Sequence, residues 1–187
     1  MKLLNLKKVR DGKYLKDYEL TYENKAGKEK IYEIVSLKEL SEPKDLGTAV
    51  TGVSIAAVHE GKLLLLKEFR MAINCEIYGL CAGHLEENES VEECIQRELY
   101  EETGLNLKRI IKIFPPSFST VTISDAKTQI AFVEAEGTIS DEHMSANEQI
   151  KAAFYTPAEV LHLIETETFS SRAQMIAYGF SKGLFRA

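Results

Sequence analysis

The first part of the chain alternates apolar and polar residues. Tyr18, Leu20 and Tyr22 alternate with charged or polar neighbours, turn-forming residues follow at 24–27, and apolar residues resume at 31–35. This alternation is typical of strands with one buried face and predicts an antiparallel β-hairpin. A polar segment at 42–47, with proline and glycine, then interrupts the pattern. We therefore expect an N-terminal β-strand extension over residues 1–45 and a larger domain over residues 46–187.

Further strands are predicted where apolar residues alternate or run together between turn signals. Residues 50–58 and 63–69 are expected to form a central pair of strands, joined by a turn. Residues 107–114, 129–135 and 149–155 are expected to add strands later in the chain. Strands, one helix, more strands and terminal helices indicate a mixed α/β (α+β) fold, without the regular alternation of a doubly wound sheet.

The clearest helix is predicted between Ser90 and Thr103. Ser90 and Glu93 have the spacing of a capping box, and no glycine or proline interrupts the segment. Gly104 stands where a left-handed C-terminal cap belongs. These signals predict both ends of the helix.

Two more helices are predicted near the C-terminus. Thr156 and Glu159 form another capping box, with Pro157 at the first helical position. A third helix is expected to begin at Ser171. We expect three of its apolar residues to face the core: Met175, Ile176 and Phe180.

Length and composition describe one ordinary globular domain, or one domain with a small extension. The chain has 187 residues, 44% of them hydrophobic and 28% charged, which excludes disordered, collagen-like and repeat proteins. No apolar run approaches the ~20 residues that span a bilayer, and the first residues do not resemble a secretory signal, so we expect a cytoplasmic protein without a membrane partner. The net charge of −6 argues against nucleic acid as a partner, because phosphate backbones require a clustered basic face.

The three cysteines, Cys75, Cys81 and Cys94, are odd in number and include no CxxC pair. This spacing is unlike that of a zinc site or of a disulfide framework. We expect reduced thiols that pack as small apolar side chains.

The first predicted helix carries acidic residues on its apolar flank. Glu98 and Glu102 are one turn apart with Glu101 beside them, and Val91 and Ile95 fall within roughly 60° of Glu98 around the helix axis. Carboxylates held beside buried aliphatic groups repel one another unless a cation joins them. Oxygen ligands without His or Cys favour Mg²⁺ or Mn²⁺ over zinc. This flank therefore predicts a divalent-metal site.

A second interpretation of the same helix requires no metal. Glu-rich helices are common, and Glu93 with Arg97 has the i,i+4 spacing of an ordinary surface ion pair. On composition alone, the two interpretations stay open.

The order of residues 83–105, GHLEENESVEECIQRELYEETGL, separates these interpretations. Its fixed letters are Gly83, Glu89, Arg97, Glu98, Glu101, Glu102 and Gly104. The segment resembles the Nudix box at every defining position, and seven fixed letters would coincide by chance on the order of once in 10⁸ windows. The predicted strands and helices on either side also look like the Nudix fold. The resemblance therefore implies a Nudix-like α/β/α sandwich from about residue 46 onward, after the N-terminal hairpin.

The resemblance implies an enzyme, a Nudix pyrophosphohydrolase that uses Mg²⁺ and water to cleave the diphosphate of a nucleoside diphosphate derivative. By the family pattern, the metal ligands would be the backbone carbonyl of Ala82 and the side chains of Glu98, Glu101 and Glu102. Arg97 would hold these carboxylates by charge-assisted hydrogen bonds. Gly83, Glu89 and Gly104 would shape the box, with the backbone freedom of Gly83 turning the Ala82 carbonyl toward the helix.

Outside the box, residues 67–70 (KEFR), 82–83 and 147–157 look most like the ADP-ribose pyrophosphatase branch of the family. That likeness implies that Arg70 contacts the substrate and that Glu148 is a candidate general base. Which carboxylate acts as the base, Glu148 or Glu101, stays open. The chain departs from the branch at Gly79 and Cys81, where Glu and Pro are common, and in the loop PPSFSTVTISD. ADP-ribose, another sugar nucleotide, a dinucleotide and a dinucleoside polyphosphate therefore all remain candidate substrates.

The branch also implies a partner and an alternative function. Its members often form homodimers through N-terminal strands, and the predicted hairpin suits that role. The alternative is a Nudix-fold sensor that binds a small nucleotide without cleaving it. Such binders typically lose box carboxylates, whereas this chain keeps all of them, so the resemblance favours the enzyme.

Overall fold

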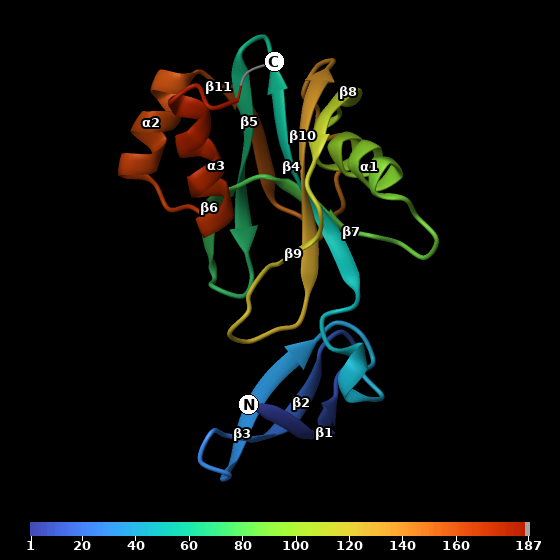
Figure 1. The fold of residues 1–187 in the computed structure, drawn as a ribbon. Helices are drawn as coiled ribbons and strands as arrows, with labels where there is room; N and C mark the ends of the chain where they lie inside the picture. Colours follow the sequence, from blue (N-terminus) through green and yellow to red (C-terminus); the bar gives the residue numbers. More distant parts are fainter. Residues whose placement is uncertain (186–187) are drawn as a thin grey trace. The chain divides into compact units, whose positions relative to one another are not determined.

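A computed structural model describes residues 1–185, whose contacts form two compact units (Figure 1). One unit comprises Met1–Thr51 and Pro116–Gln129, and the other comprises Gly52–Pro115 and Ile130–Ala187. Residues 186–187, the end of the predicted larger domain, lie outside the described residues. The boundary between the units falls within two strands, β4 and β10.

The smaller unit is built on a three-stranded antiparallel sheet in the order β1-β2-β3. Its strands are β1 (Lys2–Asp11), β2 (Lys16–Glu23) and β3 (Glu29–Ser36). The predicted hairpin is the pair β2–β3. Strand β1 was not predicted, because half of its residues are charged and most are exposed, so no apolar alternation marks it. The same unit contains a 3-10 helix, η1 (Pro43–Asp45), and a short strand, β9 (Ser117–Phe118).

The larger sheet has the order β11-β5-β4-β10-β8, with β6 paired to β5 and β7 paired to β4. The predicted strands correspond to β4 (Val50–His59), β5 (Lys62–Arg70), β8 (Asn106–Ile113), β10 (Lys127–Glu136) and β11 (Ile150–Tyr155). Two short strands, β6 (Cys75–Gly79) and β7 (Cys81–His84), were not predicted. They matter for function because β7 leads directly into the loop before the first helix.

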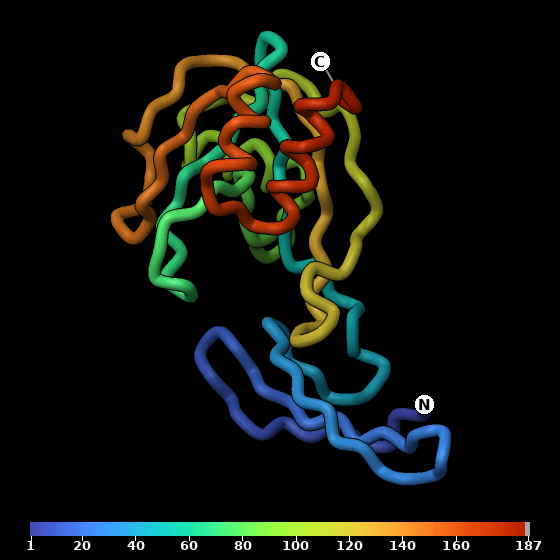
Figure 2. Tube along the Cα trace, turned by 90° about the vertical axis from the view of Figure 1, so that its left-hand side faces the viewer, coloured from blue at the N-terminus to red at the C-terminus, as the bar shows by residue number. Residues whose placement is uncertain are grey.

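Helices cover both faces of this sheet, which confirms the predicted mixed α/β sandwich. On one face, Leu64 and Leu66 of β5 share a core with residues of α1 (Val91–Thr103). On the other face, Leu63 and Leu65 share a core with α2 (Pro157–Thr166) and α3 (Ser171–Ser181), which lie side by side in Figures 1 and 2. Alternate residues of one strand thus supply both cores, as the pleat of a strand requires. Within residues 1–185, no helix is long and apolar enough to cross a membrane.

The third helix corrects one part of its prediction. Phe180 is buried and Ile176 packs against the same core, as expected. Met175, however, is 71% exposed and does not face the core. Met175 directly precedes Ile176, and the ~100° step per residue places the two side chains on different flanks of the helix.

The ends of α1 lie where their capping signals predicted. The Ser90 hydroxyl accepts from the Glu93 backbone N–H, and the Glu93 carboxylate accepts from the Ser90 N–H at 2.8 Å. At the other end, Gly104 has φ 71° and its N–H donates to the carbonyl of Tyr100. A left-handed φ disfavours residues with a Cβ, which explains glycine at this cap.

The three cysteines are free thiols, but only two of them are buried. Cys81 and Cys94 belong to the core beneath α1. Cys75 is exposed at the start of β6, so the expectation that all three pack inside was wrong for this residue.

Candidate active site

The carboxylates of α1 divide into buried and exposed groups. Glu98 and Glu102 are 9% and 7% exposed, because they lie on the flank that also buries Ile95 and Leu99 against the sheet. Glu101 is exposed beside them. Glutamates are seldom buried without a partner, so this flank carries a free-energy cost that calls for a compensating charge.

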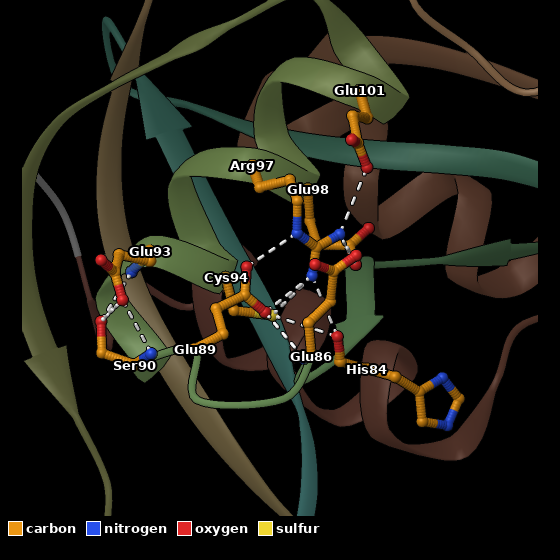
Figure 3. Close-up of polar contacts among 9 residues, drawn as sticks. All are labelled: His84, Glu86, Glu89, Ser90, Glu93, Cys94, Arg97, Glu98 and Glu101. Atoms are coloured by element: carbon orange, nitrogen blue, oxygen red, sulfur yellow. Dashed lines mark hydrogen bonds and ion pairs between the residues drawn. The ribbon is translucent and has the colours of Figure 1, made fainter.

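Arg97 is the centre of the polar contacts around these carboxylates (Figure 3). Its Nη1 donates to Glu98 Oε1 at 2.7 Å and to Glu101 Oε2 at 3.2 Å. Its Nε and Nη2 form a fork to the two oxygens of Glu89, at 2.7 and 2.9 Å. Nη2 also donates to the carbonyl of His84 at 3.0 Å. One guanidinium thereby ties the loop before α1 to the helix.

The alternative interpretation of α1 expected ordinary ion pairs along the helix, for instance between Glu93 and Arg97. Among the described residues, the ion pairs of Arg97 go to Glu89, Glu98 and Glu101 instead. The Glu93 carboxylate is used in the N-terminal cap with Ser90. The example pair is therefore not formed, although Arg97 with Glu101 is an i,i+4 pair of the same kind.

The electrostatics of the site follow from burial and from Arg97. Burial raises the pKa of Glu102 to about 8, with the Glu98 carboxylate adding to the rise. Burial also raises the pKa of Glu98, against the opposing effect of Arg97. Hydrogen bonds from Arg97 lower the pKa of Glu89 to about 2. Two carboxylates that resist ionisation thus stand beside one that is firmly ionised.

Two glycines leave space for this arrangement. A Cβ on Gly83 would lie 1.6 Å from Glu98 Oε1, and a Cβ on Gly52 would lie 2.3 Å from the carbonyl oxygen of Gly83. The φ of Gly83 lies outside the left-handed region, so the predicted reason for a glycine here, its backbone freedom, does not apply. The glycine is needed because it leaves room for the Glu98 side chain. Gly52 in β4 was not predicted, and its contact with Gly83 could be found only after β7 was known to pair with β4.

Strand β7 supplies two further partners of Glu102. The Ala82 N–H donates to Glu102 Oε2 at 3.2 Å. The buried Cys81 thiol also acts on the Glu102 carboxylate, because it opposes the rise in the pKa of Glu102. Ala82 therefore lies directly against α1, where its carbonyl was predicted to serve as a metal ligand, and that role stays a prediction.

The end of β5 brings a second group of charges to the α1 face of the sheet. Arg70 Nη2 lies 2.7 Å from Glu68 Oε2, and the Glu68 side chain is only 14% exposed. Burial raises the pKa of Glu68, Arg70 opposes the rise, and Glu148 adds to it. Sequence reasoning named Arg70 but missed Glu68. The alternation of β5 could have found it, because Glu68 and Arg70 continue the inward series of Leu64 and Leu66.

Glu148 lies just before β11, at the end of a loop that is fastened to α1. At the entry of the loop, the Ser140 N–H donates to the carbonyl of Thr103 at 2.9 Å. Further along, His143 stacks on Tyr100 with ring centroids 4.3 Å apart. Glu148 Oε2 accepts from the Ser145 N–H at 3.1 Å. The loop is thus held to α1 ahead of Glu148, whose charge adds to the rise in the pKa of Glu98.

The side chains present suit a hard divalent cation. Glu98, Glu101 and Glu102 offer carboxylate oxygens only, and burial of two of them favours a cationic partner. Within the described part of the chain, no three His, Cys, Asp or Glu side chains converge with the geometry of a metal site. Glu98 and Glu101 are turned to Arg97, and Glu102 is turned to the Ala82 N–H. The residues fit such an ion in chemistry, and their convergence on it is a matter for experiment.

The sequence pattern of the NUDIX domain matches residues 48–177, which include the whole of this site. The chain belongs to the NUDIX family. This confirms the resemblance first seen in residues 83–105.

Curated NUDIX relatives are named after sugar nucleotides. The "ADP-ribose pyrophosphatase" of Bacillus subtilis is 27% identical over 113 residues, 60% of this chain and 60% of that protein. The "GDP-mannose pyrophosphatase" of Yersinia enterocolitica is 30% identical over 150 residues, 77% of this chain and 72% of that protein. The chain thus spans about three fifths of the first relative's length.

A solved structure supports the fold of the NUDIX chain over nearly its whole length. The crystal structure of an "ADP compounds hydrolase" superposes with a TM-score of 0.76, covering 97% of this chain and 92% of that one. The sequence identity is 17%, so the match bears on the fold alone.

Proposed function

We propose that this NUDIX protein is a Mg²⁺-dependent pyrophosphohydrolase of nucleoside diphosphate derivatives, with a sugar nucleotide such as ADP-ribose as substrate and Mn²⁺ as a substitute metal. The observation that carries the proposal is the buried flank of α1, where Glu98 and Glu102 lie against the sheet. Glu98 accepts a hydrogen bond from Arg97, and Glu102 accepts one from the Ala82 N–H of β7. Burial of two glutamates on a helix costs stability unless they serve a cation.

The metal would be held by Glu98, Glu101, Glu102 and the carbonyl of Ala82. A divalent cation bound there would shield the negative charge of the diphosphate and activate a water molecule. Arg97 keeps the glutamates oriented through its hydrogen bonds, and Gly83 leaves the space in which Glu98 lies. Gly104 ends the helix that carries them.

Two charged residues outside the helix would act on the substrate. Arg70, at the end of β5, would contact phosphate oxygens with its guanidinium. Glu148 would accept a proton from the attacking water as general base, with Glu101 as the other candidate. The charge of Glu148 adds to the raised pKa values of Glu98 and Glu68, which supports its assignment to this site.

GDP-mannose is a specific second candidate substrate. The relatives named for it are 30% to 34% identical to this chain over the matched regions, against 27% for the relative named for ADP-ribose. The departure at Cys81 also lies in β7, next to Ala82, whose N–H donates to Glu102.

The decisive experiment incubates the purified chain with ADP-ribose, GDP-mannose, a dinucleotide and a dinucleoside polyphosphate, with Mg²⁺ and with EDTA. We expect a sugar nucleotide to be cleaved to a nucleoside monophosphate and a sugar phosphate only when the metal is present. The formation of these products is measured by ³¹P NMR. Reaction in ¹⁸O water would identify the phosphorus that is attacked. Tight binding without cleavage of any compound would instead favour a nucleotide sensor.

We also propose that the protein is a cytoplasmic homodimer. The sheet of the smaller unit exposes apolar side chains, including Leu4, Val9 and Ile31, which a second copy would cover. The three free thiols agree with a reducing compartment. Light scattering of the chain and of its Ile31→Asp variant would test the dimer, with a monomer expected for the variant.

A further inference from the structure

Arg70 has two glutamates within reach, one on its own strand and one on the next. In the antiparallel pair β11–β5, Ile150 is opposite Glu68. The Phe69 N–H donates to the carbonyl of Gln149 at 3.0 Å, which continues the pairing beyond β11. Extended by one more residue, this register would bring Glu148 opposite Arg70.

Opposite charges at directly opposed positions normally pair across the strands. Here, Arg70 Nη2 instead lies 2.7 Å from Glu68 Oε2, two residues earlier on its own strand. Among the described residues, Glu68 is the one carboxylate within 4.0 Å of the Arg70 guanidinium. Glu148 takes a backbone partner, the N–H of Ser145, at 3.1 Å.

The difference between the two glutamates is burial. The Glu68 side chain is 14% exposed and that of Arg70 is 47% exposed, so Glu68 provides a fixed anchor beneath a more mobile cation. An ion pair between partly buried groups at 2.7 Å restricts the guanidinium more than a solvated pair would. Without this anchor, Arg70 would be free to turn to Glu148.

We propose that Glu68 is a positioning residue, which holds Arg70 on its own strand so that the guanidinium meets the diphosphate and Glu148 stays free to accept a proton. The inference rests on the proposed function, because it assigns Arg70 to substrate and Glu148 to catalysis. It adds a residue that acts through Arg70 and does not touch the reacting atoms.

The test is a double-mutant cycle of Glu68→Ala and Arg70→Ala, with KM and kcat measured separately on the cleaved sugar nucleotide. Glu68→Ala is expected to raise KM about 10-fold and to lower kcat by a similar factor, because Arg70 both leaves the phosphate and pairs with Glu148. In the Arg70→Ala background, the same change should alter neither constant by more than about twofold. Glu68→Gln, which keeps the shape and one acceptor oxygen, should recover part of the loss.

Equal losses from Glu68→Ala in both backgrounds would overturn the proposal, since Glu68 would then act without Arg70. An unchanged KM and kcat in the single variant would overturn it as well. Glu165→Ala, an exposed change on α2, is the matched control, and melting temperatures confirm that each variant is folded.

A separate binding measurement distinguishes this inference from the proposed function. Calorimetry with ADP-ribose and GDP-mannose, without metal, compares the affinity of the unaltered chain and of the same variants. If no compound is cleaved, the proposed function fails. The positioning role would still be supported if Glu68→Ala weakens binding in the chain that has Arg70 and does not weaken it in the Arg70→Ala background. If neither compound is cleaved with Mg²⁺ and neither binds, both proposals fail.

Discussion

The helices α1 and α2 begin with the same kind of cap but bury different types of side chain. Each starts with a capping box, Ser90 with Glu93 and Thr156 with Glu159. The buried residue of α2 is Val160, in an apolar and aromatic core. The buried face of α1 includes Glu98 and Glu102. Two helices with similar caps thus cover opposite faces of one sheet. Only the α1 face buries carboxylates, which cost stability, and this is the face where we propose the active site.

The largest expected effect comes from removing the charge of that face. Glu98→Gln and Glu102→Gln should each lower kcat/KM on the order of 10²-fold or more, because ligand carboxylates position the metal. Melting temperature should stay the same or rise, since a neutral amide is less costly to bury than a carboxylate. Steady-state kinetics with Mg²⁺ and thermal denaturation measure both, with Glu92→Gln on the exposed flank as control. Full activity in either site variant would remove the basis of the proposed function.

The next effect tests the space in which Glu98 lies. Gly83→Ala would place a Cβ 1.6 Å from Glu98 Oε1, so the carboxylate must move and activity should fall about 100-fold. Gly79→Ala is the matched control, because a Cβ there meets nothing within 4 Å. Similar activities for the two variants would show that the position of Glu98 is not critical.

The opposite face should respond in stability alone. Val160→Ala in α2 removes buried methyl groups and should lower the free energy of unfolding by about 1–3 kcal/mol. The activity per folded molecule should not change, because Val160 lies in the core on the other face. Urea denaturation and kinetics at low temperature separate the two quantities. A loss of kcat in the folded variant would mean that the two faces are coupled.

The α1 face should also show a pH dependence of its stability. Burial raises the pKa of Glu102 from 4.5 to about 8, so the folded protein without metal holds a proton that the unfolded chain loses. The free energy of unfolding should therefore decrease as pH rises from about 4.5 to about 8. In EDTA, the melting temperature should fall across this range, and Glu102→Gln should flatten the slope. Parallel pH profiles for the two proteins would contradict this account.

Local signals predicted the elements better than they predicted the site. Capping boxes and Gly104 located α1 and α2 because these signals act within a few residues. Strand β1 was not predicted because charged residues interrupt its apolar positions. Met175 was wrongly assigned to the core because two adjacent apolar residues, Met175 and Ile176, were expected on the same face of the helix.

The site itself depends on contacts between distant segments. The fixed letters of residues 83–105 predicted that Arg97 and the glutamates would gather, and Arg97 does bind Glu89, Glu98 and Glu101. Gly52 and Glu68 could not be found from that motif. Their importance arises from strand pairing, which brings Gly52 to Gly83 and Glu68 to the segment of Glu148.

The loop between β10 and β11 is attached at both ends, to Thr103 through Ser140 and to Phe69 through Gln149. Exchanges at the exposed positions between these attachment points would leave the helix and the sheet undisturbed, provided that His143, Met144 and Glu148 are kept. Such a loop can diversify independently of the scaffold, so relatives could acquire new leaving groups by altering a few residues here. An engineer seeking to redirect the protein to another nucleotide would begin with this segment and leave the box intact.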